Sequence, residues 1–495
     1  MTKRFGLLAF ISQHSAFGLR AARMLLPCLL GTLLLSCTQV NIQALAADDT
    51  FLVKPYLQLG YENGFSSEDL LWFSKQSAKW EVQYKSGPSK TFQTATKITD
   101  SLITLPGQSQ PPFHKYAAKL SNLTAGADFE YKVKADGKEV FAATGKAIKK
   151  PDQPYKVAVF GDCGAGTDGQ KRLADRIMAA NPDIAVITGD IVYQQGLFSQ
   201  YLTNYFPIYN KDADKDSKAN GIPLLRSIPT VGILGNHDIA LGGRGTNLDT
   251  YPDGLAYYLC WNQPLNGYAR AAGEKNTTIL AGSEANQKAF KASAGKAFPG
   301  MANFSFDYGN SHWTVLDGNY YMDWSDQTAR LWLENDLKAS KATWKFVTFH
   351  QPAFSIDLPH AKEQRMRLIT DILQKNKVDI VFCGHAHCYE RSYPLQFGPK
   401  AGTKLTMSGD GTVDGAFNLD KDYDGVKVTK PKGIIHIVTG AGGARLYPQG
   451  QPSEEILKFG SDTYSFTDVQ VNDKTAQIRQ VDDSGKVLDQ FTVTK

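Results

Sequence analysis

Five short polar clusters stand out because each directly follows an apolar run with the length of a buried strand. In open α/β sheets, ligands bind at the carboxyl ends of the strands, so side chains in these positions are candidates for chemistry. Glycines beside four of the clusters suit a tight turn from strand to loop. The clusters are Gly161-Asp162-Cys163-Gly164, Gly189-Asp190-Ile191-Val192-Tyr193, Gly235-Asn236-His237-Asp238, Val347-Thr348-Phe349-His350 and Gly384-His385-Ala386-His387.

Together the clusters offer carboxylate, imidazole, amide and phenolate groups, which are donors suited to borderline or hard transition metals. Seven such donors are too many for one ion, and two-metal phosphatases hold their ions about 3.5–4 Å apart. His385 and His387 are two residues apart, and in a turn they can reach two different ions. The candidate ligands are Asp162, Asp190, Tyr193, Asn236, His350, His385 and His387.

In this order, and with these glycines, the clusters resemble the signature of the purple acid phosphatases, within the calcineurin-like metallophosphoesterases. The resemblance covers Tyr155 to about Gly443, and it assigns Asp190 as the bridging carboxylate. Tyr193 indicates iron, because a phenolate is a hard anionic ligand that favours the ferric ion. The ligand sets that the resemblance implies are Asp162, Tyr193 and His387 for Fe(III), and Asn236, His350 and His385 for a divalent Fe, Zn or Mn ion.

The resemblance also implies an activity, the hydrolysis of phosphate monoesters by an acid phosphatase. Two cations polarise the phosphate oxygens and lower the pKa of water enough to supply a hydroxide that attacks phosphorus in line. The leaving alkoxide then needs a proton or a positive neighbour. The histidines that match the family's residues for that task are His237 and, in plant-type members, His360, although a solvated loop position is an equal alternative for His360. We expect an acidic to near-neutral pH optimum.

Two other functions stay open. The motifs define the metals and not the leaving group, so a phosphodiesterase, nucleotide phosphatase or phosphoprotein phosphatase could use the same ligands. We expect the residues that decide this to lie in the insertions 198–229 and 255–301. The second alternative is a cell-surface binding module with an inactive phosphoesterase domain, which the intact set of ligands disfavours.

The elements that position the clusters form an α/β domain over residues 155–495, and the resemblance implies four layers in the order α-β-β-α. Residues 48–148 show short alternating strands typical of an immunoglobulin or fibronectin type III sandwich. Residues 149–154, charged and rich in proline, read as a linker. The expected strands of the α/β domain are 156–160, 184–188, 313–316, 346–349, 379–382, 434–438, 466–471 and 476–481, and its expected helices are 169–180, 328–337 and 363–375.

Residues 1–46 resemble an export signal, with basic residues that end at Arg23 and an apolar run over 24–35. Translation from Met24 is an alternative start. One cleavage site would leave Cys37 as a lipidated residue, and another follows Ala46. We therefore expect a protein that is periplasmic, secreted or lipid-anchored at the cell surface or outer membrane, with a membrane contact only through Cys37.

Charge and cysteine content exclude little. Four of the five net positive charges lie in the leader, so the remainder gives no reason to expect nucleic-acid binding. Four cysteines follow the leader, and either one disulfide or buried free thiols would fit them. We expect His436 to be a core residue, 440–443 to shape a loop near the site, and 420–425 to be an acidic surface turn, because it lacks the glutamate of a calcium loop.

Overall fold

The computed structural model describes residues 50–62, 64–108, 111–212, 221–240, 243–268 and 270–495. Asp48–Lys495 form one compact unit. The predicted leader, with Cys37, lies outside the described residues. In the ranges given above, no helix combines the length and the apolar character needed to traverse a bilayer.

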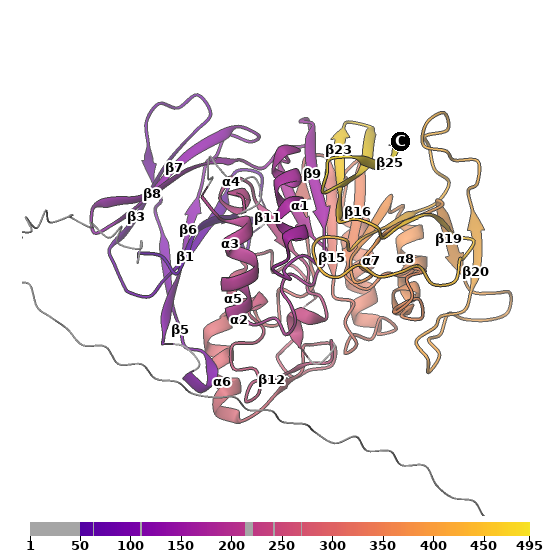
Figure 1. The fold of residues 1–495 in the computed structure, drawn as a ribbon, viewed down its shortest axis with the longest axis horizontal. Coiled ribbons are helices and arrows are strands. Elements are labelled where there is room, and N and C mark those ends of the chain that lie inside the picture. Colours follow the sequence, from indigo (N-terminus) through magenta and orange to yellow (C-terminus); the bar gives the residue numbers. More distant parts are fainter. Residues whose placement is uncertain (1–49, 63, 109–110, 213–220, 241–242, 269) are drawn as a thin grey trace, which may run out of the picture. The chain divides into compact units, whose positions relative to one another are not determined.

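The N-terminal region is a β-sandwich, as the alternating pattern predicts (Figure 1, indigo to purple). Its two antiparallel sheets have the strand orders β1-β2-β6-β5 and β4-β3-β7-β8. Side chains from both sheets, such as Trp72, Val82 and Tyr131, are buried in a common core. The strands are β1 (Val53–Gln58), β2 (Glu68–Ser74), β3 (Trp80–Ser86), β4 (Gln93–Thr94), β5 (Ile98–Ile103), β6 (Phe113–Leu120), β7 (Asp128–Ala135) and β8 (Lys138–Lys146).

Two larger sheets form the centre of the α/β domain. From one edge to the other, the six-stranded sheet contains β11 (Thr230–Gly232), β10 (Ile184–Ile187), β9 (Tyr155–Phe160), β23 (Ser465–Asn472), β24 (Thr475–Asp482) and β25 (Val487–Thr494). The seven-stranded sheet contains β14 (Phe304–Tyr308), β15 (Ser311–Leu316), β16 (Trp344–Phe349), β17 (Ile380–Cys383), β21 (Ile435–Thr439), β18 (Tyr389–Ser392) and β22 (Ile456–Gly460). Strands β9, β10 and β11 are parallel, as are β15, β16, β17 and β21.

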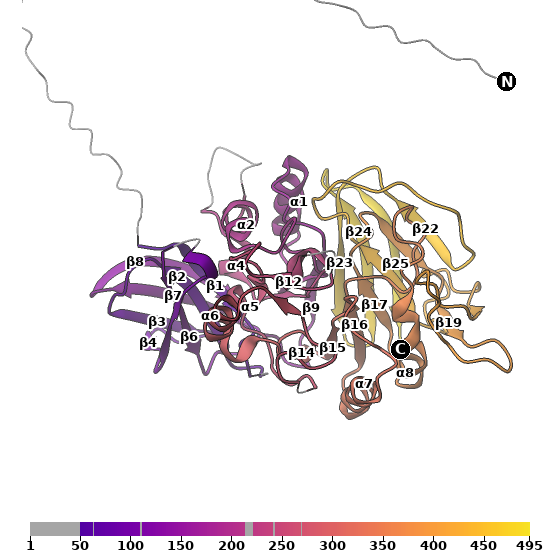
Figure 2. The same cartoon turned by 90° about the horizontal axis from the view of Figure 1, so that it is seen from below.

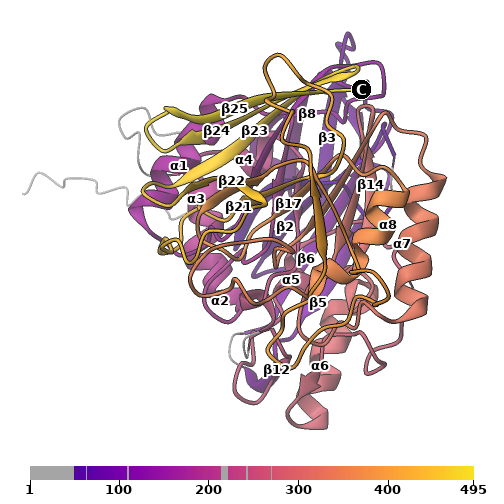
Figure 3. The ribbon, with the colours of Figure 1, turned by 90° about the vertical axis from the view of Figure 1, so that its right-hand side faces the viewer.

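Alternate residues of the parallel strands pack in different layers, because successive side chains point to opposite faces of a sheet. Val157 and Val159 of β9 lie in the core between the sheets, with Phe346 of β16. Ala158 and Phe160 pack in another cluster with helix α1 (Asp168–Ala179). Helices α7 (Gln327–Ala339) and α8 (Thr370–Lys375) cover the outer face of the seven-stranded sheet. Figures 2 and 3 show α1 on one side of the strands and α7 and α8 on the other, so the domain has the expected four layers.

The insertions connect the α/β domain to the sandwich. Phe198 stacks on Phe113 of the sandwich with ring centroids 4.7 Å apart, and Tyr56 donates a hydrogen bond to the carbonyl oxygen of Cys260. At these contacts the insertions serve domain packing. The shorter elements are α2 (Phe198–Gln200), α3 (Phe206–Tyr209), α4 (Leu224–Ser227), α5 (Tyr257–Cys260), α6 (Glu284–Ala294), β12 (Thr246–Asn247), β13 (Leu280–Ala281), β19 (Leu395–Gly398) and β20 (Ala416–Leu419).

One predicted helix is wrong in its first half. Residues Arg365–Ile369 form a 3-10 helix, and α8 begins only at Thr370. The buried guanidinium groups of Arg365 and Arg367 donate to carbonyl oxygens of Gly318 and Ala353. These contacts to other segments outweigh the local helical pattern.

Two histidines outside the polar clusters and all four cysteines of the described residues are buried. His436 is buried against the ring of Phe354, as expected of a core residue. His312 has partners that the sequence did not indicate, since it lies between the carboxylates of Asp307 and Asp336. The four cysteines of the described chain, Cys163, Cys260, Cys383 and Cys388, are buried free thiols.

Candidate metal centre

All five polar clusters follow parallel strands of the two central sheets. The first three come after β9, β10 and β11 of one sheet, and the other two after β16 and β17 of the other sheet. Because parallel strands end at the same edge, the loops from both sheets meet there. The structure thus brings together side chains that lie as much as 225 residues apart in the chain, from Asp162 to His387.

One group of donors surrounds Tyr193. Its hydroxyl oxygen lies 3.1 Å from Oδ1 of Asp162 and 3.0 Å from Nε2 of His387. Asp162, Asp190 and His387 also each offer a ligand atom within 4.8 Å of the others. These are the four residues expected to hold Fe(III).

A second group surrounds Asn236. Its Oδ1 lies 3.0 Å from Nε2 of His350 and 2.8 Å from Nδ1 of His385. The same Nε2 of His350 lies 3.2 Å from Oδ1 of Asp190. Asp190 therefore contributes to both groups, which is the arrangement expected of a bridging ligand.

Three of the candidate ligands have a positive φ angle, which residues other than glycine rarely adopt. The φ angles are +57° at Asp162, +49° at Asp190 and +68° at His385. A left-handed conformation costs a non-glycine residue roughly 1–2 kcal/mol. Hydrogen bonds offset this cost, for example from the backbone N–H of His385 to the carboxylate of Asp162. Strain gathered at one place is typical of a functional site.

The space around Asp190 requires glycine at Gly235. A Cβ atom on Gly235 would lie 2.2 Å from the backbone nitrogen and from Oδ1 of Asp190. No side chain fits at that distance. The glycine in this motif therefore allows the third loop to approach the carboxylate that both groups share.

The histidines are oriented by hydrogen bonds on the side away from the cluster. Nδ1 of His350 donates to the carbonyl oxygen of Thr188, and Nδ1 of His387 donates to that of Arg445. His385 is turned the other way, with Nε2 facing Glu363 at 3.1 Å and Nδ1 facing the cluster. Such partners select the tautomer and leave the inner nitrogen free to bind a metal.

The electrostatics of the site favour positive charge. Asp162 and Asp190 are both fully buried. Burial lowers the pKa of His350, but the neighbouring carboxylates of Asp190 and Asp162 overcome this effect and raise the pKa to about 10. Burial and the same two carboxylates raise the pKa of the Tyr193 phenol well above its ordinary value. The donor types and this excess of buried negative charge fit a pair of cations.

Comparison with known proteins agrees with this geometry. Residues 155–389 match the family model described as calcineurin-like phosphoesterase, and residues 433–490 match the one described as iron/zinc purple acid phosphatase-like protein C. The chain belongs to the calcineurin-like phosphoesterases of the purple acid phosphatase type. The likeness extends beyond Gly443, where the resemblance seen in the sequence ends.

Individual relatives and one solved structure are similar to the chain. Purple acid phosphatase 23 of Arabidopsis thaliana is 26% identical over 316 residues, which is 59% of each protein. An uncharacterised protein of Mycobacterium tuberculosis is 24% identical over 359 residues, covering 67% of this chain and 60% of its own length. The matches thus span less than two thirds of these relatives. The structure of purple acid phosphatase PPD1 from yellow lupin (Lupinus luteus) seeds shares the fold, with a TM-score of 0.60, 18% identity, and coverage of 89% of this chain and 74% of that one.

The two histidines expected to assist the leaving group of a purple acid phosphatase reaction both lie at the site. His237 is about one third exposed, and its Nε2 lies 3.9 Å from Oδ2 of Asp190. His360 lies with its ring 4.0 Å from that of His385. The structure therefore contradicts a solvated loop position for His360, because the segment after Pro359 folds back onto the centre. The roles of both histidines, and of the seven ligands, stay predictions.

Three further residues of this purple acid phosphatase-type site were missed by the sequence motifs. Asp357 is fully buried, and its Oδ2 accepts a hydrogen bond from Nδ1 of His360 at 2.7 Å. Glu363 faces His385, and the ring of Tyr447 stacks on that of His387. Asp357 and Glu363 stand three residues on either side of His360, a signal in the sequence, whereas nothing local marks Tyr447.

The glycine-rich segment 440–443 lies at the site, as expected. The backbone N–H of Gly442 donates to the carbonyl oxygen of Gly161, and that of Ala444 donates to the carbonyl oxygen of Asp162. The segment thus supports the first motif through its backbone.

Proposed function

We propose that the protein hydrolyses phosphate monoesters at a dinuclear centre of Fe(III) and a divalent Fe, Zn or Mn ion. The observation that supports this most is the position of Asp190, whose carboxylate belongs to both donor groups, one of them with a phenol at its centre. Membership of the family supports a phosphoesterase. The activity of the whole protein, its metals and its substrate are parts of the proposal.

The bound cations would polarise the phosphate and make a water acidic enough to attack phosphorus in line. The chain supplies the positioning. Asp162, Asp190, Tyr193 and His387 would hold one cation, and Asp190 with Asn236, His350 and His385 would hold the other. His237 lies beside the centre with Nδ1 hydrogen-bonded to the carbonyl oxygen of Gln194, so Nε2 is the atom that would face the leaving oxygen. His360, held by Asp357, would serve a second such position.

A visible absorption spectrum of the purified protein, together with metal analysis, tests the ferric assignment. Tyrosinate bound to Fe(III) gives a charge-transfer band, so we expect a coloured protein with about one ferric iron per chain. A colourless and iron-free enzyme that is fully active would contradict it. A pH optimum well above neutrality would also count against the ferric ion.

The substrate class needs a separate test. The fold and the ligands leave the alternative of a phosphodiesterase, or a nucleotide or phosphoprotein phosphatase, on the same centre. We expect p-nitrophenyl phosphate to be hydrolysed with a higher kcat/KM than bis-p-nitrophenyl phosphate or ATP. The reverse order would replace the monoesterase by one of these alternatives.

A binding module without activity is the alternative from another class. One relative, 22% identical over 371 residues, is described as a probable inactive purple acid phosphatase. The presence of all seven candidate ligands in two groups favours an active enzyme here. Asp190→Asn distinguishes the two, since loss of hydrolysis with a retained thermal unfolding transition supports catalysis at this centre, and unchanged hydrolysis contradicts it.

We further propose that the protein is exported, either with a lipid at Cys37 or free after cleavage behind Ala46. This proposal rests on the composition of residues 1–46 alone. Cell fractionation of the full chain and of Cys37→Ser tests it. Release of only the variant from the membrane fraction would support the lipid anchor, and a soluble exported wild-type protein would support cleavage at the second site.

A further inference from the structure

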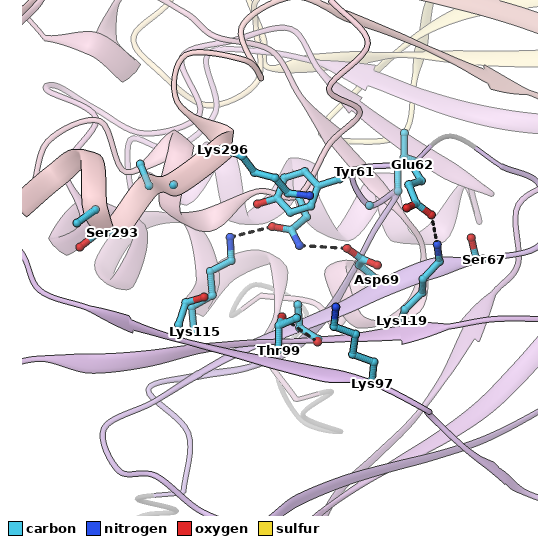
Figure 4. A pocket seen from close by; sticks show the side chains of 18 residues that line it. Tyr61, Glu62, Ser67, Asp69, Lys97, Thr99, Lys115, Lys119, Ser293 and Lys296 are labelled. Atoms are coloured by element: carbon cyan, nitrogen blue, oxygen red, sulfur yellow. Dashed lines mark hydrogen bonds and ion pairs between the residues drawn. The ribbon is translucent and has the colours of Figure 1, made fainter. Parts of the chain in front are cut away.

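A polar cavity separate from the metal centre lies between the sandwich and the end of helix α6. Its volume is about 360 Å³, which is within the range of small-molecule sites. Strands β2, β5 and β6 form its floor, and residues 292–296 and Asn262 form the opposite wall (Figure 4). None of the seven candidate metal ligands lines it.

The floor is one face of the sheet β1-β2-β6-β5. In the register of this sheet Asp69 lies opposite Lys119, Thr99 opposite Ala117, and Ser101 opposite Lys115. Because alternate residues of a strand share a face, these side chains all point to the same side. Polar side chains of this kind usually face water on a sandwich. Here residues 292–296 and Asn262 of the α/β domain lie opposite them, so that Lys115 is buried while Thr99 and Ser101 stay exposed beside the cavity.

Positive charge dominates this cavity, with four lysines against the two carboxylates of Glu62 and Asp69. Lys119 pairs with Glu62, and Lys296 lies over the ring of Tyr61 at 4.2 Å. Lys97 is exposed and has no ion pair or hydrogen bond with any other described residue. Figure 4 shows Lys97 and Lys115 extending from the floor toward the opposite wall.

Lys115 is the most buried of these lysines. Its side-chain nitrogen donates to Oδ1 of Asn262 at 2.8 Å, and Nδ2 of Asn262 donates to Oδ2 of Asp69. Burial lowers the pKa of Lys115 to about 8, because its ammonium loses contact with water, and the carboxylate of Asp69 only partly offsets this effect. An ammonium in such surroundings is stabilised by an anion placed beside it.

The remaining lining groups suit hydroxyl groups better than an aromatic base. Ser67, Thr99, Ser101 and Asp69 offer hydrogen-bonding oxygens along the floor. Tyr61 is the one aromatic side chain among the lining residues, and Lys296 covers its face. The lining therefore offers a nucleobase no aromatic ring other than this one, and Lys296 occupies one of its faces.

We propose that this cavity binds an anionic sugar, with its phosphate or carboxylate among Lys97, Lys115 and Lys296 and its hydroxyl groups on Asp69, Thr99 and Ser101. The proposal is independent of the metal centre, since no residue that lines the cavity is a candidate metal ligand. It gives the sandwich a role in binding as well as in packing.

Isothermal titration calorimetry of the full, metal-loaded protein tests this proposal. The probes are D-glucuronate and the non-hydrolysable phosphonate analogue of glucose 6-phosphate, with glucose and inorganic phosphate for comparison. We expect at least one of the two anionic sugars to bind at a site that Lys97→Ala/Lys296→Ala weakens at least tenfold. We expect this variant to bind ligands at the metal centre as the wild type does. Binding that the substitutions weaken is therefore assigned to the cavity, and binding that they leave unchanged is assigned to the metal centre. The preference between the two sugars shows whether the acidic group is phosphate or carboxylate.

The matched control is Lys90→Ala/Lys138→Ala, which removes two exposed lysines of the sandwich that do not line the cavity. It should bind as the wild type does. Lys115→Met provides a second test inside the cavity, with thermal unfolding as the check on its fold. The proposal is overturned if neither anionic sugar binds, if both bind equally to wild type and to Lys97→Ala/Lys296→Ala, or if glucose or inorganic phosphate binds as tightly as they do at the site that these two substitutions weaken.

Discussion

The carboxylate of Asp238 accepts a hydrogen bond from the backbone N–H of Ile191, the residue that follows Asp190 in the chain (3.1 Å). Its Oδ2 also accepts one from the N–H of Gly235 at 2.9 Å. Asp238 is fully buried. One side chain therefore joins the loop after β10 to the loop after β11 and holds the shared carboxylate in place.

Replacing Asp238 should destabilise the fold. Asp238→Ala leaves two buried backbone N–H groups without a partner, each costing about 1–3 kcal/mol. We expect the free energy of unfolding in urea to fall by about 2–6 kcal/mol. Asp410→Ala, which removes an exposed carboxylate that accepts from the N–H of Thr412, should change it by less than about 1 kcal/mol. Equal effects of the two substitutions would show that Asp238 does not brace the loops.

Tyr193→Phe tests the ferric ligand directly. The substitution removes the hydroxyl that lies between Asp162 and His387 and keeps the ring. We expect the visible absorption band to disappear and the iron content to fall. Tyr447→Phe is the control, because its ring stacks on His387 but its hydroxyl is not a candidate ligand, and it should keep the band. A band that survives in Tyr193→Phe assigns the colour to another group.

His237→Ala should reveal whether the leaving group needs a proton. General acid catalysis contributes about 10²–10⁴-fold, and it matters most for poor leaving groups. We expect kcat for an alkyl phosphate to fall within that range, and kcat for p-nitrophenyl phosphate to fall much less. His114→Ala, on the sandwich, should leave both rates unchanged. A uniform loss for the two substrates would assign His237 to substrate binding or metal support.

The hydrogen bond between Asp357 and His360 predicts that the effect of Asp357 on catalysis depends on the presence of His360. Asp357 fixes the ring of His360 through its Nδ1 at 2.7 Å. Asp357→Asn should lower kcat for an alkyl phosphate roughly 10- to 100-fold, with a smaller change in KM. If Asp357 acts through His360, the double variant Asp357→Asn/His360→Ala should be no slower than His360→Ala alone. Additive losses would separate the two residues.

His312 predicts a fall in stability at alkaline pH. Burial lowers its pKa, but the hydrogen bonds to Asp307 and Asp336 dominate and raise the pKa to about 9, above its ordinary value of 6.5. A pKa raised by folding means that the folded state holds the proton more tightly. The stabilisation is therefore complete below about pH 6.5 and is lost as the pH rises through about 9.

Urea unfolding of wild type and His312→Gln at several pH values measures this contribution. A shift of this size corresponds to roughly 3 kcal/mol. Between pH 6.5 and 9.5 the wild type should lose more unfolding free energy than the variant, by up to about that amount. Parallel pH profiles of the two proteins would exclude His312 as the source.

Short-range patterns in the sequence predicted most of the candidate centre. Asp162, Asp190 and His350 follow apolar strands, and that position alone brings them to one edge of two sheets. The strands of β9, β10, β16 and β17 were predicted within a few residues, because strands buried on both faces are continuously apolar. The helix over 363–375 was predicted too long, since the contacts of Arg365 and Arg367 with other segments are not visible in a local pattern.

Local patterns in the chain specify the donor types, their order and the turns that carry them, because strands, turns and glycines are each recognisable from a few neighbouring residues. Contacts between distant segments specify which donors share a neighbour, that Asp238 braces two loops, and that Asp357 holds His360 at the centre. They also form the basic cavity between the sandwich and the α/β domain. Such relationships depend on contacts between residues far apart in the chain, and a sequence pattern records each residue without its distant partners.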